Sequence, residues 1–325
     1  MPPPARDAKI PTLRAGPLHA ARGVMSAPLV SVVLPTLNRA ERLRRSAGSV
    51  LAQTERDLEL LVVDDGSDED IAAAVAALND PRARCIRREQ RGGPAAARNT
   101  GIRAARGQYL AFQDSDDEWL LDKLERMLAV MREHPDTDLL ICNILRIGSN
   151  GLRRVPAATK IREISHQEVL SRPADVYMQC WLAKRIVVTQ AGGLDESLFL
   201  WDDWEILLRI SRHHKLRRLP EPLVVAEFSE DSITGQSEKW PENLERVLSK
   251  HGEYLSGFPK QFSFHLCVLG RQWGRVGERR KAISAARRAI QVRPTYGRGW
   301  LWLLAIIAGP TALKWLFRVQ RRLGQ

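Results

Sequence analysis

The chain has 325 residues, of which 44% are hydrophobic, and a formal net charge of +12. This length suits one large α/β domain with an appendage, and the hydrophobic content is that of an ordinary globular protein. The four cysteines lie far apart without a CxxC pair, which argues against a zinc site or a disulfide framework and predicts a reducing, cytoplasmic location.

The positive charge is concentrated at the C-terminal end. Residues 246–325 contain sixteen Lys or Arg and only two acidic residues, Glu253 and Glu278, so the rest of the chain is slightly acidic. The basic character therefore concerns what the tail contacts, such as anionic lipid or nucleic acid, more than the chemistry of an active site. Because no nucleic-acid reader motif is present, we do not expect nucleic acid as a partner.

Residues 1–28 are rich in proline and arginine and have no apolar period. Such a segment cannot build a core, and we expect it to be disordered. Met1 and Met25 both remain possible start sites.

From residue 29 onward, apolar strands alternate with amphipathic helices. We predict strands at 29–34, 59–63, 84–87, 109–112 and 138–145, separated by helices at 40–53, 68–78, 95–105 and 120–132. This order implies parallel pairing with right-handed crossovers. The predicted fold class is therefore α/β, with a Rossmann-like, mostly parallel sheet flanked by helices.

Polar side chains follow several of these strands. Asn38 follows the first strand, Asp65 the second, and Asp114 and Asp116 the fourth. The carboxyl ends of parallel strands share one edge of a sheet, where open α/β sheets bind ligands. The first strand is followed by PTLNR rather than GxGxxG, so a pyrophosphate site built from a glycine loop is not available.

The stretch LAFQDSDDEW, residues 110–119, places acidic side chains directly after an apolar strand. Carboxylates at i and i+2 of a non-helical turn, here Asp114 and Asp116, can converge on one Mg²⁺ or Mn²⁺. The alternative is a solvated acidic turn that caps a helix starting near Trp119. A DxD pattern alone does not decide between these readings.

Four separated stretches together resemble the family 2 glycosyltransferases, which have the GT-A fold. They occupy residues 30–54, 58–70, 91–119 and 192–210, and their order is far more specific than any one of them. The resemblance covers residues 29–235 and implies a GT-A catalytic domain there. It further implies an inverting transfer of a sugar from a nucleotide-sugar donor, with a UDP-sugar favoured, to a hydroxyl of a glycan or lipid-linked acceptor. The expected role is the synthesis of cell-surface polysaccharide or glycan.

The same resemblance implies a donor site at the strand ends. Its donor-binding residues are Pro35, Thr36, Asn38, Asp65, Arg98 and Asp114. Pro35 and Thr36 would back the base and Asp65 would accept a hydrogen bond from it. Arg98 would lie near base or phosphate, Asp114 near the ribose, and Asp116 would bind the Mn²⁺ or Mg²⁺.

The segment WDDW, residues 201–204, opens a predicted helix. Its two carboxylates could simply favour the helix dipole. In the family this position, usually ED, carries the general base, so the resemblance implies that Asp203 is catalytic, with Asp202 and Trp204 on the acceptor side. A single base implies inversion.

The sequence departs from the family at one point. A His is expected near the Ser-Ile-Thr run at 232–234, and Ser229 stands in its place. This leaves a third metal ligand undetermined. The other reading of the whole chain is therefore a catalytically silent nucleotide-sugar or membrane-binding protein with the same fold.

Residues 236–325 are expected to form a helical, basic extension. Residues 261–308 resemble a single tetratricopeptide-like hairpin, which cannot bury its own face and should pack on the catalytic domain. About thirteen apolar or small residues precede Lys314, and as a helix they would reach about 20 Å, short of a hydrocarbon core of about 30 Å. We expect this end to lie on the inner face of the plasma membrane beside anionic lipid; the alternative is a buried C-terminal helix.

Overall fold

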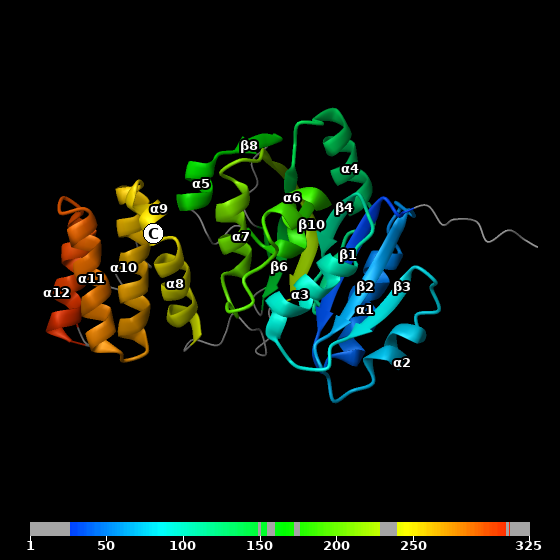
Figure 1. Ribbon diagram of the computed structural model, residues 1–325, viewed down its shortest axis with the longest axis horizontal. Coiled ribbons are helices and arrows are strands. Elements are labelled where there is room, and N and C mark those ends of the chain that lie inside the picture. Colours follow the sequence, from blue (N-terminus) through cyan, green and yellow to red (C-terminus); the bar gives the residue numbers. More distant parts are fainter. Residues whose placement is uncertain are drawn as a thin grey trace, which may run out of the picture.

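The computed structural model describes residues 27–148, 151–154, 160–171, 176–227, 239–309 and 312 (Figure 1). The segment predicted to be disordered is 1–28, and its residues 1–26 lie outside this range. The Ser-Ile-Thr run and Ser229 also lie outside it.

A ten-stranded sheet forms the centre of the described structure. Its strands are β1 (Val30–Thr36), β2 (Leu58–Asp64), β3 (Ala83–Arg87), β4 (Tyr109–Phe112), β5 (Asp117–Trp119), β6 (Leu139–Gly148), β7 (Gly151–Arg154), β8 (Arg162–Ile164), β9 (Trp181–Lys184) and β10 (Leu216–Glu227). The main path runs β3-β2-β1-β4-β9-β6-β10-β5, with β7 on β6 and β8 on β10.

The sheet is mixed. Strands β3, β2, β1 and β4 are parallel, as predicted. Strand β9 is antiparallel to both β4 and β6, and β10 is parallel to β6 but antiparallel to β5. Parallel strands that are covered on both faces have continuous apolar sequences, and every residue of β2 is buried.

Helices flank this sheet in the first two thirds of the chain (Figure 1). They are α1 (Ala40–Leu51), α2 (Ile71–Ala76), α3 (Gly93–Ala104), α4 (Lys123–Glu133), α5 (His166–Ser171), α6 (Arg185–Gln190) and α7 (Asp202–Ile210). A 3-10 turn, η2 (Met178–Cys180), precedes β9.

The segment after the acidic turn differs from the prediction. Residues 117–119 form β5 and pair with Val224–Ala226 of β10, so the following helix begins at Lys123 rather than at residue 120. The alternative of an acidic turn capping a helix near Trp119 is therefore wrong. Pairing with a strand about a hundred residues away decides this segment, and a local pattern does not report such pairing.

The C-terminal region is helical. It comprises α8 (Lys239–Lys250), α9 (Gly252–Ser256), α10 (Pro259–Arg275), α11 (Arg279–Val292) and α12 (Gly297–Ala308). Figure 1 shows α10, α11 and α12 side by side at one end of the molecule. Among the residues that the structure describes, no helix combines the length and apolarity needed to cross a bilayer.

The C-terminal helices pack against the sheet-bearing part of the chain. His265 of α10 donates from Nε2 to the carbonyl oxygen of Leu170, at 2.5 Å, and its ring lies 4.8 Å from that of Trp204. Asn243 of α8 accepts the backbone N–H of Phe199 at 2.7 Å. These contacts bury the face that a single helical hairpin could not cover by itself.

Candidate active site

The acidic turn between β4 and β5 is held by helix α1. Ser46 Oγ donates to the carbonyl oxygen of Asp114 at 2.7 Å, and Ser49 Oγ accepts the N–H of Trp119 at 3.1 Å. At the start of the same helix, Arg39 Nη1 lies 2.8 Å from Asp116 Oδ2. The turn is thus fixed beside the end of β1, at the sheet edge where the sequence predicts it.

Arg98 of α3 joins this turn to helix α7. Its Nη2 lies 2.7 Å from Asp114 Oδ1, and its Nη1 lies 3.0 Å from Asp202 Oδ2. The residue is 9% exposed. Burial alone would lower the pKa of the Arg98 guanidinium, but the charges of Asp114 and Asp202 outweigh burial and raise it. Arg98 is therefore a permanent cation between two carboxylates that are far apart in the sequence.

Asp203 stands next to this ion pair in the first turn of α7. Burial, followed by the negative charge of Asp202, raises the pKa of Asp203 to about 7. Its Oδ1 accepts the N–H of Trp204 at 2.7 Å, and the side chain is half-buried. A carboxylate with a pKa near neutrality can accept a proton at physiological pH and release it again.

Asp117 behaves differently from the other acids of the turn. It is buried, and burial together with the charges of Asp114 and Asp116 raises its pKa to about 8. Gln179 Nε2 donates to Asp117 Oδ2 at 2.8 Å. Asp117 is thus largely protonated at neutral pH. It is a buried residue that helps to hold the acidic turn in place.

Asp65 organises the loop before α3. Its carboxylate accepts the N–H groups of Gly92 (3.0 Å) and Gly93 (2.7 Å) and pairs with Arg88 Nη1 at 3.0 Å. Gly93 has a φ of +84°, a conformation that favours glycine. The predicted hydrogen bond from a base to Asp65 would therefore add to a carboxylate already fixed by its own loop.

The end of β1 offers an open hydrogen-bonding position. Thr36 is 3% exposed, and its buried Oγ1 has no partner in the described part of the chain. The half-buried Pro35 lies beside it. Buried hydroxyls are normally paired, so this oxygen suits the base that the family resemblance places here.

Asn38 serves the loops around the site. Its φ is +52°, its backbone N–H donates to Ser67 Oγ at 2.9 Å, and its Oδ1 accepts the N–H of Asp68 at 2.7 Å. The side chain thus ties the loop after β1 to the loop after β2. Its donor-binding role, which the family resemblance implies, stays a prediction.

Trp204 requires a correction. The sequence assigns it to the acceptor side, but it is fully buried, and its Nε1 donates to the carbonyl oxygen of Val169 at 2.9 Å. Its position on the inner face of α7 makes it part of the core. Trp201, three residues earlier, is half-buried and packs edge-on against Trp240 with ring centres 4.6 Å apart.

The structure adds two residues that sequence reasoning missed. Arg39 was detectable in principle, because it adjoins Asn38 at the same sheet edge as the acidic turn. Gln179 gave no local signal, since it is an isolated polar residue in a segment without periodicity. It is 62 positions away from Asp117, its partner.

The donor type and charge of the turn fit a hard divalent cation. Asp114 and Asp116 offer carboxylate oxygens, the ligands that Mg²⁺ and Mn²⁺ prefer. The guanidinium groups of Arg98 and Arg39 now stand at these two carboxylates as positive partners. Within the described ranges no three His, Cys, Asp or Glu side chains are grouped to hold a metal, so water and phosphate oxygens would complete such a shell.

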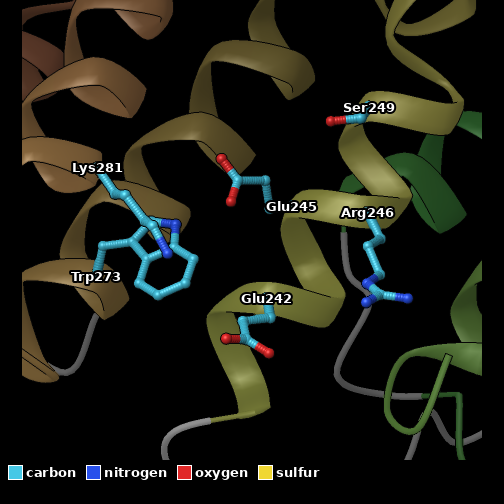
Figure 2. Close-up of a pocket in the computed structure, with 6 residues that line it drawn as sticks. All are labelled: Glu242, Glu245, Arg246, Ser249, Trp273 and Lys281. Atoms are coloured by element: carbon cyan, nitrogen blue, oxygen red, sulfur yellow. The ribbon is translucent and has the colours of Figure 1, made fainter. Parts of the chain in front are cut away.

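A separate hollow of about 380 Å³ lies among the C-terminal helices. Figure 2 shows Glu242 and Glu245 of α8 facing Trp273 of α10 and Lys281 of α11. Lys281 Nζ lies 4.1 Å from the centre of the Trp273 ring and covers its face. None of the site residues predicted from the sequence lines this hollow. Its lining contains both acidic and basic side chains, and it lies where helices α8, α10 and α11 meet.

Comparisons with family models, curated proteins and solved structures all point to the same kind of protein. The model of the family described as "Glycosyl transferase family 2" matches residues 31–193. A succinoglycan biosynthesis protein of Rhizobium meliloti is 35% identical over 191 residues, 55% of this chain and 55% of that protein. An Escherichia coli UDP-Glc:alpha-D-GlcNAc-diphosphoundecaprenol beta-1,3-glucosyltransferase is 40% identical over 103 residues, 32% of this chain and 41% of that protein.

Among solved structures, S. aureus TarS 1–349 in complex with UDP-GlcNAc matches with a TM-score of 0.61 and 16% identity, over 91% of this chain and 92% of that chain. This likeness shows the shared fold. The chain covers 19% of the length of an uncharacterised Rickettsia conorii glycosyltransferase and 55% of the length of the Rhizobium protein, less than two thirds of either relative. The family match covers half of the chain and includes β1, β2, β4 and the acidic turn, so the chain belongs to glycosyl transferase family 2.

Proposed function

We propose that this protein is an inverting glycosyltransferase that moves a sugar from a nucleotide-sugar donor to a hydroxyl group of a growing glycan. The observation that carries the proposal is the Arg98 bridge. It brings Asp114 of the donor-side turn and Asp202 of α7 onto one guanidinium, at 2.7 and 3.0 Å. Asp203, whose pKa is raised to about 7, is the next residue.

The donor is best accommodated along the ends of β1, β2 and β4. Thr36 offers an unpaired buried hydroxyl for the base, and the family resemblance assigns Asp65 to the base and Asp114 to the ribose. Two S. aureus structures with the same fold contain UDP and UDP-GlcNAc, which favours a UDP-sugar. When bound at Asp116, an Mg²⁺ or Mn²⁺ would neutralise the negative charge of the departing diphosphate.

The transfer step assigned to Asp203 is a single displacement. Asp203 accepts the proton of the acceptor hydroxyl while that oxygen forms a bond to the anomeric carbon. The bond from this carbon to the diphosphate oxygen breaks, and the nucleoside diphosphate leaves with the electron pair. Attack on the face opposite the leaving group inverts the anomeric centre, and a positioned base contributes roughly 10²- to 10⁴-fold to such a step.

The acceptor is proposed from the relatives. The Rhizobium protein is named for succinoglycan biosynthesis, and the E. coli enzyme is named for transfer to a sugar on diphosphoundecaprenol. Both names support a polysaccharide or lipid-linked glycan acceptor. The test is a panel of nucleotide-sugars with Mn²⁺ or Mg²⁺ and lipid-linked acceptors, read by the nucleoside diphosphate released and by the anomeric configuration of the product. Retention of configuration would contradict the single displacement.

We also propose that α12 rests on an anionic membrane surface at the inner face of the plasma membrane. The helix exposes four large apolar side chains at helical spacing, Trp300, Leu301, Leu304 and Ile307. Four basic residues follow in the sequence, at positions 314, 318, 321 and 322. An apolar face beside positive charge is typical of helices that lie in the interface of a bilayer. Such a position would bring the enzyme close to a lipid-linked acceptor.

A catalytically silent binder is the competing reading. Such a protein would need no carboxylate with a pKa near neutrality beside the donor-side turn. The buried Arg98 bridge and the raised pKa of Asp203 therefore favour the enzyme. A chain that binds UDP-sugar but releases no UDP with any acceptor of the panel would support the silent binder instead.

A further inference from the structure

Arg39 forms an ion pair with the carboxylate of Asp116. Its Nη1 lies 2.8 Å from Asp116 Oδ2 and 3.3 Å from Ser115 Oγ, so the guanidinium holds two successive residues of the acidic turn. The two side chains of the ion pair are 20% and 23% exposed. A cation from the protein itself thus stands at the carboxylate that the proposed function gives to the metal.

The backbone of Arg39 is fixed, whereas its side chain can move. Arg39 is the N-cap residue of α1, and it directly follows Asn38, whose side chain and N–H are both bonded to the loop after β2. An arginine side chain has several rotatable bonds, so the guanidinium can leave Asp116 without any change in the fold.

Arg98 has a different position. It lies deeper, is 9% exposed, and is paired with two carboxylates at once. Removing its guanidinium from Asp114 would leave Asp202 as an unpaired buried charge, which is costly. Of the two arginines at the turn, Arg39 is therefore the one that a divalent cation can displace.

We propose that Arg39 is an exchangeable counter-cation. In the metal-free protein it neutralises Asp116, and when a divalent cation and the donor bind it leaves Asp116 and pairs with the diphosphate. This inference rests on the metal site of the proposed function. Like charges repel at short range, so the guanidinium and the metal compete for one carboxylate. Guanidinium groups pair well with phosphate oxygens, which gives the released side chain its second partner.

This exchange predicts effects of opposite sign in one variant. Arg39→Ala removes the competitor, so the protein without nucleotide should bind Mn²⁺ more tightly, by roughly three- to tenfold. At saturating Mn²⁺ the same variant should bind UDP several-fold more weakly, because the diphosphate loses a positive partner. A merely structural role for Arg39 would weaken both ligands together. Neither measurement requires turnover.

The experiment uses the full chain, with bound Mn²⁺ followed by the electron paramagnetic resonance signal of the free ion and UDP binding followed by calorimetry. The matched control is Arg45→Ala. Arg45 pairs with Glu118 at 2.7 Å, two residues beyond Asp116, with side chains 52% and 38% exposed. Like Arg39→Ala, the Arg45→Ala variant removes one positive charge near the acidic turn. It should change Mn²⁺ affinity less than about twofold, as expected for an exposed pair. Arg39→Gln repeats the test with a neutral side chain that preserves more of the packing.

The outcomes separate the inference from the proposed function. If Arg39→Ala and Arg39→Gln leave Mn²⁺ affinity unchanged while Asp116→Asn abolishes binding, the turn holds the metal and Arg39 does not compete for it. If Asp116→Asn also leaves Mn²⁺ affinity unchanged, the metal site itself is misplaced, and the exchange fails with it. If the Arg39 and Arg45 variants bind Mn²⁺ more tightly by the same factor, the cause is the lower net positive charge of the protein, and the proposal is overturned.

Discussion

Asp203 combines a half-buried position with a negatively charged neighbour, Asp202. Both raise its pKa, which reaches about 7 against a usual value of 3.8. A base works only in its deprotonated form. If the pKa of Asp203 is raised, activity is therefore lost at a higher pH as the solution is acidified. The residue is therefore well placed to accept a proton at neutral pH, and it should report this role in the pH dependence of the reaction.

We predict that the rate of sugar transfer at saturating donor and metal rises by about tenfold per pH unit below pH 7 and levels off above it. The sign follows from protonation: below its pKa, Asp203 already carries the proton that it should accept. Stopped assays from pH 5.5 to 8.5 measure this. A rate that is constant over this range would mean that the base has the pKa of an ordinary aspartate, or lies elsewhere.

Asp116 should matter through its charge. We expect Asp116→Asn to abolish detectable turnover and to weaken donor binding in the presence of Mn²⁺, because the carboxylate that would hold the cation is lost. Asp122→Asn is a suitable control, since Asp122 pairs with Arg126 at 2.5 Å and its side chain is 37% exposed. Full activity of Asp116→Asn, or of the unchanged protein in excess chelator, would contradict a metal-assisted reaction.

Helix α7 carries the proposed base, Asp203, and contacts the C-terminal helices. Its fully buried Glu205 accepts from His251 Nε2 at 2.9 Å, pairs with Lys250 Nζ at 2.9 Å and with Arg209 Nη2 at 2.6 Å. Burial alone would raise the pKa of Glu205, but hydrogen bonds from His251 and Arg209 lower it to about 2. Contacts of Glu205 with Lys250, the last residue of α8, and with His251 thus hold the helix that carries Asp203.

We predict that Glu205→Gln lowers the free energy of unfolding by about 3 kcal/mol at pH 7. The folded pKa is depressed below the usual 4.5, so this stabilisation is complete above about pH 4.5 and is lost as the pH falls toward 2. Urea unfolding should show the difference from the unchanged protein shrinking by about half at pH 3. The control Glu221→Gln, in an exposed pair with Arg126, should cost less than about 1 kcal/mol. A pH-independent difference would assign the loss to packing.

At the scale of elements, the sequence predicts what local patterns encode. The parallel strands β1, β2 and β4 are largely apolar, and the polar residues after them lie at one edge of the sheet. Strands β5 and β9 were not recognised, because they form by pairing with strands that are distant in the chain, which a local pattern does not report.

The same limit applies to the candidate site. The motifs nominate Asp116, Asp114 and Asp203, but the contact between Arg98 of α3 and Asp202 of α7 spans 104 positions, and no local motif reports it. Trp204 was assigned to the wrong face of its helix, because the segment WDDW fixes neither the rotation of α7 nor its contact with α10. Long-range packing decides both.

The molecule as a whole carries the candidate active site in its sheet-bearing part and an exposed apolar face on α12. Leu301 and Leu304 are 53% and 62% exposed, far more than the core residues of the same helix, Trp302 and Ile306. This face lies at the end of the molecule that is opposite to β3 (Figure 1), and basic residues follow it in the sequence. We therefore place the proposed membrane contact there.

We predict that the double variant Leu301→Asp and Leu304→Asp no longer floats with vesicles that contain anionic lipid, while the unchanged protein does so at physiological salt. Two carboxylates on this face oppose both its apolar burial and its attraction to negative lipid. Thermal unfolding should change little, because both side chains are exposed. The double variant Glu242→Gln and Glu245→Gln, on α8, keeps the α12 face and should float as before. Flotation of the Leu variant would show that α12 is not the contact.

The central claim is that Asp203 is the base of a sugar transfer. The most direct measurement compares donor affinity and single-turnover rate in Asp203→Asn, with Asp70→Asn as a control for a carboxylate that only caps a helix, since Asp70 accepts the N–H of Ala73 at 2.9 Å. We predict that Asp203→Asn binds the UDP-sugar within about twofold of the unchanged protein while its transfer rate falls by roughly 10² to 10⁴. Asp70→Asn should change neither. Equal, mild losses in the two variants would mean that Asp203 merely stabilises the start of α7, and the assignment of the base would be wrong.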